Sequence, residues 1–498
     1  MGDRQAEKPG GAFRYHRLAV DLEIKIKKGV YKAGEKLPSI RKLQMQTGFS
    51  MTTAYRAFIE LEKRGLVEAR PKSGYFVRPA SHCRLPGPAC KQAPAVPHRV
   101  SVNALARSVV EAMGNSEILQ LGGTLTAPEL LPTRQLQRCL RTFSRDRVET
   151  MFTTYADPSG EPELRRQIAQ RLLDFPKPVD SDDLVITSGC IEAISLCLQA
   201  VTEPGDTVVV ESPTYPWFLQ IIEDLNLFAL EVTTDPVDGI DLPLLEKAVS
   251  ENRVKVCLLV PNFQNPLGLE MSIANKRALV RMMSARDIPI IEDDIHGDLY
   301  FNDRRPLPLK AFDEKGLVLY CSSFSKTLAP GLRIGWTLPG RFREAVRRLK
   351  LNLTIASPVL NQHLIGAFLQ TGAYERHLRR LRTALKNQAS DMARAVARYF
   401  PEGTCVTSPQ GGLTLWIDLN PHVDSLAIFN EARRHRIAIL PGLICSTTSR
   451  YRNCIRLSYG FPFTGAVENG IRTLGGLIRR EQAGAAEGAG PPPTQRLT

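Results

Sequence analysis

The chain has 498 residues, of which 43% are apolar and 23% charged, and a formal net charge of +14. Its length predicts about three domains. No apolar run approaches the ~18 residues that span a bilayer, and the first residues lack the apolar core of a signal peptide. These features exclude membrane and secreted classes, so we expect a cytoplasmic protein. The ten cysteines form no Cys-x-x-Cys pair and no Cys/His cluster, which predicts reduced thiols and no metal site.

Positive charge is concentrated near the start of the chain. Residues 14–78 hold fifteen Lys or Arg and six Asp or Glu, which gives this small segment a net charge of +9. Such asymmetry indicates a polyanionic partner for the segment. A solvated basic surface without a partner would show the same charge pattern and is the alternative.

The stretch LPSIRKLQMQTGFSMTTAYRAFIELEKRGLV predicts two helices joined by a turn. Ser39 and Ser50 are suited to cap the two helices, and Gly48 to end the first one in a left-handed turn. The following residues, VEARPKSGYFV, predict two short strands joined in a hairpin. Three apolar residues share one face of the second helix: Ala54, Phe58 and Leu61.

The second helix of such a pair enters the DNA major groove through its first turn. Hydroxyls and arginines there can reach phosphates and base edges, and neighbouring basic residues can bind the phosphate backbone. The alternative is a basic helical dimerisation module that does not bind DNA. We predict double-stranded DNA as the partner and expect these contacts: Ser39, Arg41, Ser50, Thr52, Thr53, Arg56 and Lys72.

Residues 14–78 resemble the winged helix of GntR-type regulators. The resemblance rests on the pattern G-x-KLPS-x-R, which begins at Gly34, and on the wing sequence SGYFV. It implies a DNA-binding transcription regulator. Members often carry arginine directly after the serine that begins the recognition helix, whereas this chain has Met51, so we expect its operator to differ at one base pair.

Composition divides the rest of the chain into three parts. Residues 79–100 contain five prolines without a periodic pattern, which predicts a semi-rigid linker. Between 101 and 480, short apolar strands alternate with helical patterns, which predicts an α/β domain with a largely parallel sheet. Residues 481–498 are rich in Ala, Gly and Pro and are expected to be disordered.

The stretch SSFSKTLAPGLRIG follows an apolar strand and combines hydroxyls, a lysine and an arginine. Lys326 can form a Schiff base with the aldehyde of pyridoxal 5′-phosphate (PLP). Ser323, Ser325 and Arg333 can surround the phosphate of this cofactor. Backbone N–H groups at a helix N-terminus form a second half of an anion site, and the sequence TSGCIEA places three residues there: Ser188, Gly189 and Cys190.

Further residues suit other parts of PLP. Asp293 follows the strand IPII, where a carboxylate can keep the pyridine nitrogen protonated, and Asn265 can donate to the ring 3′-oxygen. Tyr215 can stack on the cofactor face, and Arg456 can bind a carboxylate. Considered by itself, each of these residues has another interpretation. Asn265 could cap a turn, Tyr215 could be a core aromatic and Arg456 a surface arginine. Asp293 could form a solvated loop pair, or half of a metal site, with Asp294.

Residues 101–480 resemble fold-type I PLP-dependent aminotransferases of the aspartate aminotransferase superfamily. The resemblance implies Lys326 as the Schiff-base lysine and Asp293 as the pyridinium partner. It also implies that Tyr155 reaches the phosphate of the neighbouring subunit, and therefore a homodimer. Three residues after the pyridinium aspartate, relatives usually have a tyrosine that binds the 3′-oxygen, whereas this chain has His296. We expect His296 to line the cofactor site and transamination to be slow.

The combined chain resembles the MocR subfamily of GntR-type regulators. The expected fold class is α/β, with an N-terminal winged helix-turn-helix and a fold-type I transferase domain that has a mostly parallel sheet and a smaller C-terminal α+β subdomain. The resemblance implies a regulator that senses an amine, an amino acid or PLP itself, as a homodimer with head-to-tail swapped domains. Two alternatives stay open: a working aminotransferase with an incidental DNA-binding module, and a DNA-binding protein whose large domain is only a scaffold.

Overall fold

The structure is a computed structural model that divides into two compact units, Met1–Arg84 and Leu85–Thr498, each described by itself. None of the helices in the described part of the chain has the length and apolar character needed to cross a bilayer. The residues that the structure describes are 14–32, 34–70, 73–77, 85–93, 96–101, 108–109, 117–172, 175 and 178–488.

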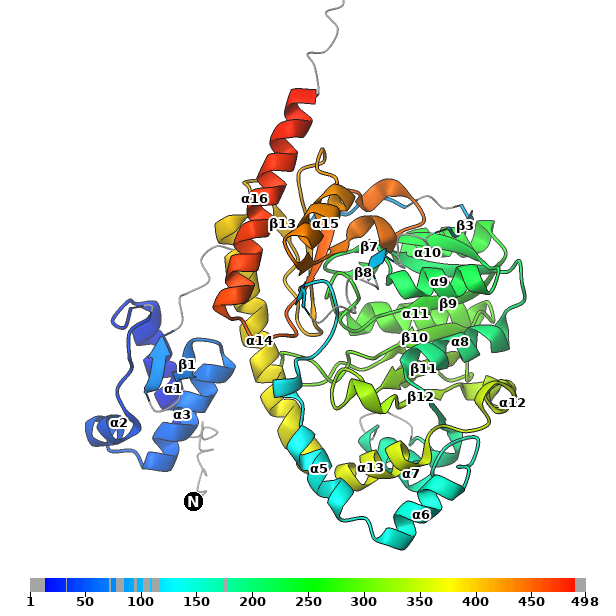
Figure 1. The fold of residues 1–498 in the computed structure, drawn as a ribbon, viewed down its shortest axis with the longest axis horizontal. Helices are drawn as coiled ribbons and strands as arrows, with labels where there is room; N and C mark the ends of the chain where they lie inside the picture. The colour runs from blue at the N-terminus through cyan, green and yellow to red at the C-terminus, as the bar shows by residue number, and fades with distance from the viewer. Residues whose placement is uncertain are drawn as a thin grey trace, which may run out of the picture. The chain divides into compact units, whose positions relative to one another are not determined.

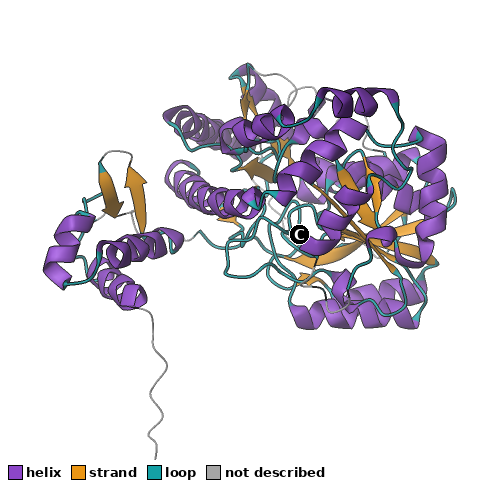
Figure 2. Ribbon diagram, turned by 90° about the horizontal axis from the view of Figure 1, so that it is seen from below, coloured by secondary structure: helices purple, strands orange, loops and turns teal. Residues whose placement is uncertain are grey.

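The N-terminal unit is the predicted pair of helices and hairpin, preceded by one further helix (Figures 1 and 2). The two strands pair antiparallel, with Val67 opposite Val77. Its elements are α1 (Arg14–Lys27), α2 (Ile40–Thr47), α3 (Met51–Lys63), β1 (Val67–Arg70) and β2 (Gly74–Val77).

Local capping explains where these helices begin and end. The Ser39 hydroxyl accepts from the amide of Lys42 at 3.2 Å, and the Ser50 hydroxyl accepts from the amide of Thr53 at 3.1 Å. Gly48 ends α2 with φ of 70°, a conformation that costs glycine little. These three predictions are confirmed.

The core of this unit joins the recognition helix to the wing. Ala54, Phe58 and Leu61 of α3 are fully buried, as their shared face predicts. The Phe58 ring stacks on Tyr75 of β2 with 4.4 Å between centroids. The helix and the hairpin are therefore held as one body.

The C-terminal unit is built on a nine-stranded sheet with the order β3-β7-β6-β9-β10-β11-β12-β5, in which β8 also pairs with β7. The five strands from β7 to β11 run parallel to one another, as the sequence predicts, while β3 and β12 run antiparallel to their neighbours. The strands are β3 (His98–Arg99), β5 (Val185–Thr187), β6 (Thr207–Ser212), β7 (Phe228–Asp235), β8 (Gly239–Ile240), β9 (Val254–Leu259), β10 (Ile290–Asp293), β11 (Val318–Ser323) and β12 (Gly335–Leu338).

Helices cover both faces of this sheet (Figure 2). Val208 and Val210 of β6 join a core with α8, α9 and α12, whereas Val209 points to the opposite face and joins a core with α10 and α11. This follows from the alternation of side chains along a strand. The covering helices are α8 (Cys190–Val201), α9 (Pro216–Asp224), α10 (Leu242–Glu251), α11 (Ile273–Ala285) and α12 (Arg343–Thr354).

A smaller α+β subdomain completes the unit, as predicted. Its four strands form an antiparallel sheet with the order β13-β14-β17-β16, which packs with α14, α15 and α16 around one apolar core (Figure 1). The elements are β13 (Cys405–Val406), β14 (Thr414–Asp418), β16 (Leu440–Pro441), β17 (Cys454–Ser458), α14 (Ala373–Tyr399), α15 (Ser425–Arg434) and α16 (Gly465–Gly488).

The remaining elements connect these layers. A short parallel pair, β4 and β15, places Leu119 opposite Ile437 and so joins the start of the unit to the small subdomain. The elements are β4 (Leu119–Gln120), β15 (Ile437–Ala438), α5 (Thr133–Arg141), α6 (Arg145–Thr153), α7 (Pro162–Arg171) and α13 (Val359–Gln370).

The structure differs from the expected linker in its second half. Residues 85–93 are part of the C-terminal unit and pack on its small subdomain: the amide of Val406 donates to the carbonyl of Pro86 at 2.9 Å. The Lys91 ammonium donates to Asp418 at 3.2 Å and to Asn453 at 2.7 Å. These two acceptors thus fix a segment that composition alone assigns to a linker. Residues 79–84 lie outside the described range.

The expected disordered tail also begins later than Glu481. Helix α16 continues to Gly488, eight residues beyond the expected boundary at 480. The physical reason is the sequence EQAGAAEG, whose alanines are the strongest helix formers and offset its glycines. Residues 489–498 lie outside the described range.

Candidate functional site

A cavity opens at the carboxyl ends of the parallel strands, where α/β folds commonly bind ligands. It brings together eight of the predicted cofactor residues, which come from five separate stretches of sequence. The lining residues are Thr124, Cys190, Ile191, Tyr215, Val260, Asn265, Asp293, Ile295, His296, Ser325, Lys326 and Arg333.

Lys326 lies three residues beyond the end of β11. Its ammonium donates to the carbonyl of Thr124 at 2.6 Å. Burial, followed by the positive charge of Arg456, lowers the pKa of Lys326 to about 8, against a smaller opposing effect of Asp293. A larger fraction of this lysine is therefore the free amine, which is the nucleophilic form.

Asp293 is the last residue of β10 and is 4% exposed. Its Oδ1 accepts from the amide of Ile295 at 3.0 Å and from the Cys190 thiol at 3.3 Å. Burial raises the pKa of Asp293 to about 6, although these two hydrogen bonds favour the ionised form. A cation placed beside this carboxylate would stabilise its charge.

Arg456 of β17 is 1% exposed, and it contacts Asn265, which lines the cavity. Its Nη1 donates to Asn265 Oδ1 at 2.8 Å, and its Nη2 donates to the carbonyl of Gly122 at 2.6 Å. Both acceptors are neutral, and burial lowers the pKa of Arg456. A buried guanidinium with neutral partners favours an incoming anion.

Arg333 and Cys190, the first residue of α8, also line the cavity. Arg333 donates to the Ser188 carbonyl at 2.7 Å and to the Ser325 hydroxyl at 3.4 Å. Gly189 has φ of 102°, and a Cβ there would lie 2.4 Å from Arg333 Nη2. The close approach of Arg333 to the helix N-terminus therefore depends on glycine, and together they form a site suited to an anion.

Two residues predicted to bind the phosphate have other partners. The amide of Ser188 donates to Glu192 Oε2 at 2.5 Å, so this N–H group is engaged within its own helix turn. Ser323 is 3% exposed, and its hydroxyl accepts from the amide of Ser325 at 3.2 Å. Neither Ser188 nor Ser323 lines the cavity.

Two aromatic residues line the cavity from other elements. Tyr215 precedes α9, and its ring stacks on Trp217 with 5.4 Å between centroids and meets Phe218 edge-on at 5.3 Å. His296 is 2% exposed, and its Nδ1 lies 3.3 Å from the carbonyl oxygen of Phe263. Both rings are held by neighbours outside the cavity.

Tyr155 lies apart from these residues. It follows α6, is 81% exposed and does not line the cavity.

Asp294, the second carboxylate after β10, pairs with Arg305 at 2.5 Å and accepts from Tyr320 at 2.9 Å. Among the described residues no group of His, Cys, Asp or Glu could hold a metal ion.

The candidate DNA-contacting residues surround the start of α3. Arg41, Thr52 and Arg56 are exposed, while Thr53 is half-buried and its hydroxyl lies 2.9 Å from that of Ser50. A surface hollow beside them is lined by Arg14, Arg41, Gln44, Met45, Gly48, Phe49, Ser50 and Met51. Lys72 lies outside the described residues.

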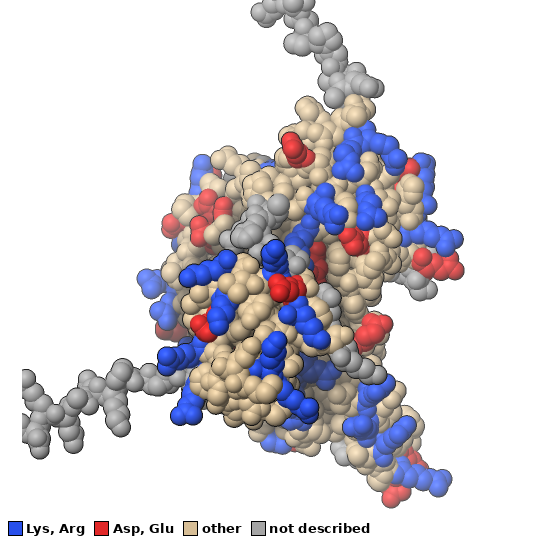
Figure 3. All heavy atoms as spheres, turned by 90° about the vertical axis from the view of Figure 1, so that its left-hand side faces the viewer, with Lys and Arg blue, Asp and Glu red and all other residues tan. Residues whose placement is uncertain are grey.

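One face of the molecule carries many basic side chains. Figure 3 presents one face, on which Lys and Arg side chains are spread broadly and Asp and Glu side chains lie among them. This agrees with the net charge of +14. A surface of this kind favours association with a polyanion such as DNA.

Comparison with known proteins divides the chain in the same way as the structure. Residues 14–77 match the family described as bacterial regulatory proteins, gntR family, and residues 129–462 match the family aminotransferase class I and II. Two regulators from Escherichia coli, YjiR and YdcR, are similar over both parts. They are 35% and 36% identical, with 94% of this chain and 99% of each relative covered. The chain belongs to the MocR subfamily of GntR-type regulators.

Solved structures resemble the large unit of this MocR-type regulator. Kynurenine aminotransferase from Pyrococcus horikoshii, solved with PMP, is 29% identical with a TM-score of 0.70, and 76% of this chain and 95% of that chain are covered. LysN, an α-aminoadipate aminotransferase from Thermus thermophilus solved with N-(5′-phosphopyridoxyl)-L-leucine, is 27% identical with a TM-score of 0.71, and 77% and 96% are covered. The predicted regulator with an aminotransferase-like domain is confirmed.

Residues 121–126, LGGTLT, contribute to the site although no motif predicts them. Thr124 lines the cavity and accepts from Lys326, and Gly122 accepts from Arg456. Both act through backbone carbonyls, which no side-chain motif reveals. The signal that could have found them is the Gly-Gly pair that begins two residues after the end of β4. It permits close backbone approach, since a Cβ on Gly122 would lie 2.5 Å from Ile439.

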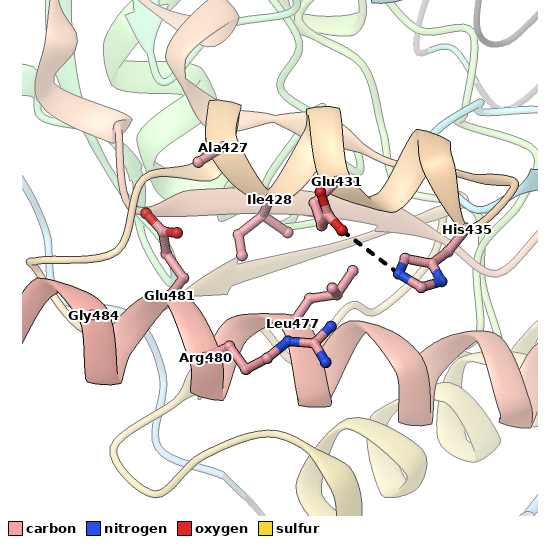
Figure 4. A pocket seen from close by; sticks show the side chains of 8 residues that line it. All are labelled: Ala427, Ile428, Glu431, His435, Leu477, Arg480, Glu481 and Gly484. Carbon is pink, nitrogen blue, oxygen red and sulfur yellow. Dashed lines mark ion pairs between the residues drawn. The ribbon is translucent and has the colours of Figure 1, made fainter.

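A larger hollow lies on the surface between α15 and α16 (Figure 4). Ile428 of α15 and Leu477 of α16 line it from its two sides, and along α15 the Glu431 carboxylate lies 3.7 Å from His435 Nε2. None of the predicted site residues borders this hollow. The predicted cofactor residues gather instead at the smaller cavity at the strand ends.

Proposed function

We propose that this MocR-type regulator binds PLP in the cavity at the strand ends and controls its binding to double-stranded DNA through that site. The observation that carries the proposal is the convergence of Lys326, Asp293 and Arg333 on one cavity in a chain that also has a winged helix. PLP is the cofactor of the aminotransferase-like family to which the large unit belongs. When bound, it supplies an electron-withdrawing pyridine ring.

The residues around the cavity fit the parts of PLP. Arg333, with the Ser325 hydroxyl and the start of α8, would hold the phosphate, since cations and helix N-termini favour anions. Asp293 would bind the protonated pyridine nitrogen, because its buried carboxylate has no cation as a hydrogen-bond partner among the described residues. Lys326 would join the cofactor covalently through its amine. Tyr215 would stack on the ring.

The effector we propose is an amino acid, bound through its carboxylate by Arg456. Nη1 and Nη2 of this residue have only neutral acceptors in the structure, and its Nε is buried with no hydrogen-bond partner in the described part of the chain. A carboxylate would balance this charge in a region that excludes water. An amine without a carboxylate, or PLP itself, would leave Arg456 uncompensated.

We also propose a homodimer with head-to-tail swapped domains. The support is Tyr155, whose 81% exposure leaves its hydroxyl free to reach the phosphate of a second copy.

On the DNA side, we propose that Arg41, Arg56 and Lys72 contact phosphates. We further propose that Ser39, Ser50, Thr52 and Thr53 position the first turns of α2 and α3 on the duplex.

Borohydride trapping tests the cofactor part of this proposal. The full-length protein is incubated with PLP, reduced and digested, and the peptides are weighed by mass spectrometry. We expect the phosphopyridoxyl mass on the peptide that contains Lys326, and no adduct there in Lys326→Arg. Adducts confined to exposed lysines such as Lys247, which is 62% exposed, would contradict the proposal.

A further inference from the structure

His296 is held rigidly at the edge of the cavity. It lies in the turn after β10, where the amide of Leu299 donates to its carbonyl at 2.8 Å. A Cβ on Gly412 would lie 3.9 Å from His296 Cγ and 3.1 Å from the Phe263 side chain, so glycine permits this packing. The side chain is 2% exposed, and its ring orientation is therefore set by the protein.

The contact with Phe263 fixes the position of the ring proton. Nδ1 of His296 lies 3.3 Å from the Phe263 carbonyl oxygen, and a carbonyl only accepts hydrogen bonds. Nδ1 therefore carries a proton. Burial, followed by the charge of Lys326, lowers the pKa of His296 to about 3, so the ring is neutral near pH 7. In a neutral imidazole with a proton on Nδ1, Nε2 holds a lone pair and can only accept.

Nε2 of His296 is buried and has no hydrogen-bond partner among the described residues. His296 lines the cavity. Asn265 lines the same cavity, and its orientation is also fixed. An arginine only donates, so the oxygen of Asn265 faces Arg456 Nη1 at 2.8 Å. The side-chain amide nitrogen of Asn265 can therefore donate a hydrogen bond to a ligand.

We propose that Nε2 of His296 and the amide nitrogen of Asn265 form a donor–acceptor pair that selects a neutral hydroxyl group on the bound ligand. A hydroxyl both accepts and donates, so it satisfies both side chains. An ionised oxygen only accepts, and it would bring negative charge against the His296 lone pair. This inference rests on the proposed function, in which the hydroxyl is the one on the PLP ring.

The consequence distinguishes this chain from one with tyrosine at position 296. A tyrosine hydroxyl donates and would stabilise the ionised ring oxygen, whereas His296 in this tautomer stabilises the protonated one. The two forms absorb differently, because ionisation of the ring oxygen moves the absorption of bound PLP from the ultraviolet to the visible. His296 is thus a positioning residue that sets the charge of the cofactor rather than a proton carrier.

The first test measures the tautomer directly in the full-length protein. Nitrogen-15 NMR of histidine-labelled protein separates rings with the proton on Nδ1 from those with the proton on Nε2, and His296→Gln identifies the signal. We expect the proton of His296 on Nδ1. His377 is an internal control, since its Nε2 lies 2.6 Å from the Thr327 carbonyl oxygen and should carry the proton. A His296 signal with the proton on Nε2 would overturn the proposal.

The second test compares absorption spectra of PLP-loaded variants at neutral pH. We expect His296→Tyr to raise the ratio of visible to ultraviolet absorption by about tenfold or more, as a hydrogen bond to a charged oxygen allows. His296→Phe should raise it less, because it removes the acceptor without adding a donor. His435→Tyr, the same change at a position 45% exposed, should not alter it. An unchanged ratio in His296→Tyr would contradict the proposal.

These readouts separate the two proposals. If borohydride trapping finds no adduct on Lys326, the proposed cofactor site fails, yet the NMR signal still reports the His296 tautomer. If the adduct forms and the tautomer is the opposite one, the cofactor site stands and the hydroxyl-selecting pair is wrong.

Discussion

At the scale of single residues, the cavity is defined by charges that the protein does not neutralise. The half-buried Lys326 and the buried Arg456 are both basic, and the charge of Arg456 lowers the pKa of Lys326. Asp293 is the carboxylate that lines the cavity beside them. Because a net positive site in a region of low dielectric attracts anions, the phosphate and carboxylate groups of the proposed ligands suit it.

The lowered pKa of Lys326 predicts how its reactivity depends on pH. Since the folded pKa is about 8 and the ordinary value is 10.5, the unfolded chain binds this proton more tightly. The contribution of Lys326 to the free energy of unfolding therefore increases from about pH 8 to pH 10.5. Because the free amine of Lys326 is the reactive form, the rate of PLP attachment should rise with pH and reach half of its maximum near pH 8.

Borohydride trapping at a series of pH values, with the Lys326 peptide quantified by mass, measures this rate. Lys247 on the surface serves as the control for the pH dependence of the reagent itself. A half-maximum near pH 10 on the Lys326 peptide would show that the fold does not lower its pKa.

Motif order and residue type predicted most of the cavity, and the failures have a physical reason. Asp293, Lys326 and Arg333 stand at strand ends or in the turn that follows, so the topology of a parallel sheet brings them together. The carbonyl of Thr124 and the engagement of Ser188 by Glu192 escape prediction. Backbone acceptors and local helix caps depend on φ and ψ, which a side-chain pattern does not determine.

At the scale of elements, the recognition helix depends on its cap. Substituting Ser50 by Ala removes the acceptor for the Thr53 amide and should cost about 1 kcal/mol of helix stability. We expect amide hydrogen exchange in α3 to quicken by roughly fivefold in the full-length protein. Thr52→Ala, in the same turn but not at the cap position, is the matched control. Equal exchange in the Ser50 and Thr52 variants would contradict this role for the cap.

If α2 and α3 contact DNA phosphates, the DNA affinity of the protein should depend on the salt concentration. Arg41→Ala should weaken binding to all DNA sequences and reduce the slope of log K against log salt by about one. Fluorescence anisotropy at several salt concentrations measures the slope. Arg434→Ala removes an equal charge from the large unit, where Arg434 is 78% exposed, and should leave the slope unchanged. A slope that Arg41→Ala does not alter would remove this residue from the interface.

Periodicity predicted the elements well, whereas composition was a poor guide to the connections. Strand β10 overlaps the apolar run IPII, and β11 occurs where an apolar strand is predicted before the stretch SSFSK. The many prolines predict that residues 85–93 belong to a linker, yet Lys91 binds Asp418 and Asn453, which are distant in sequence. A long-range ion pair of this kind has no local sequence signal.

At the scale of the whole molecule, the proposed dimer makes each cofactor site from two chains. Tyr155→Phe removes one hydrogen bond to a charged phosphate, so it should weaken PLP binding by about tenfold or more. Mixing Tyr155→Phe with Lys326→Ala should form hybrid dimers in which one site regains both intact residues. We expect a fraction of sites with wild-type PLP affinity after mixing, measured by absorbance titration. Affinity that stays at the level of the separate variants would contradict shared sites.

The central claim is that the cofactor cavity controls DNA binding, and footprinting tests it most directly. The PLP-loaded full-length protein is bound to DNA selected from a random library, and the twenty L-amino acids and their decarboxylated amines are added one at a time. We predict that at least one amino acid changes the footprint, that its amine does not, and that Arg456→Gln binds the same DNA but loses the response. A footprint that no amino acid alters, or an equal response in Arg456→Gln, would contradict the account.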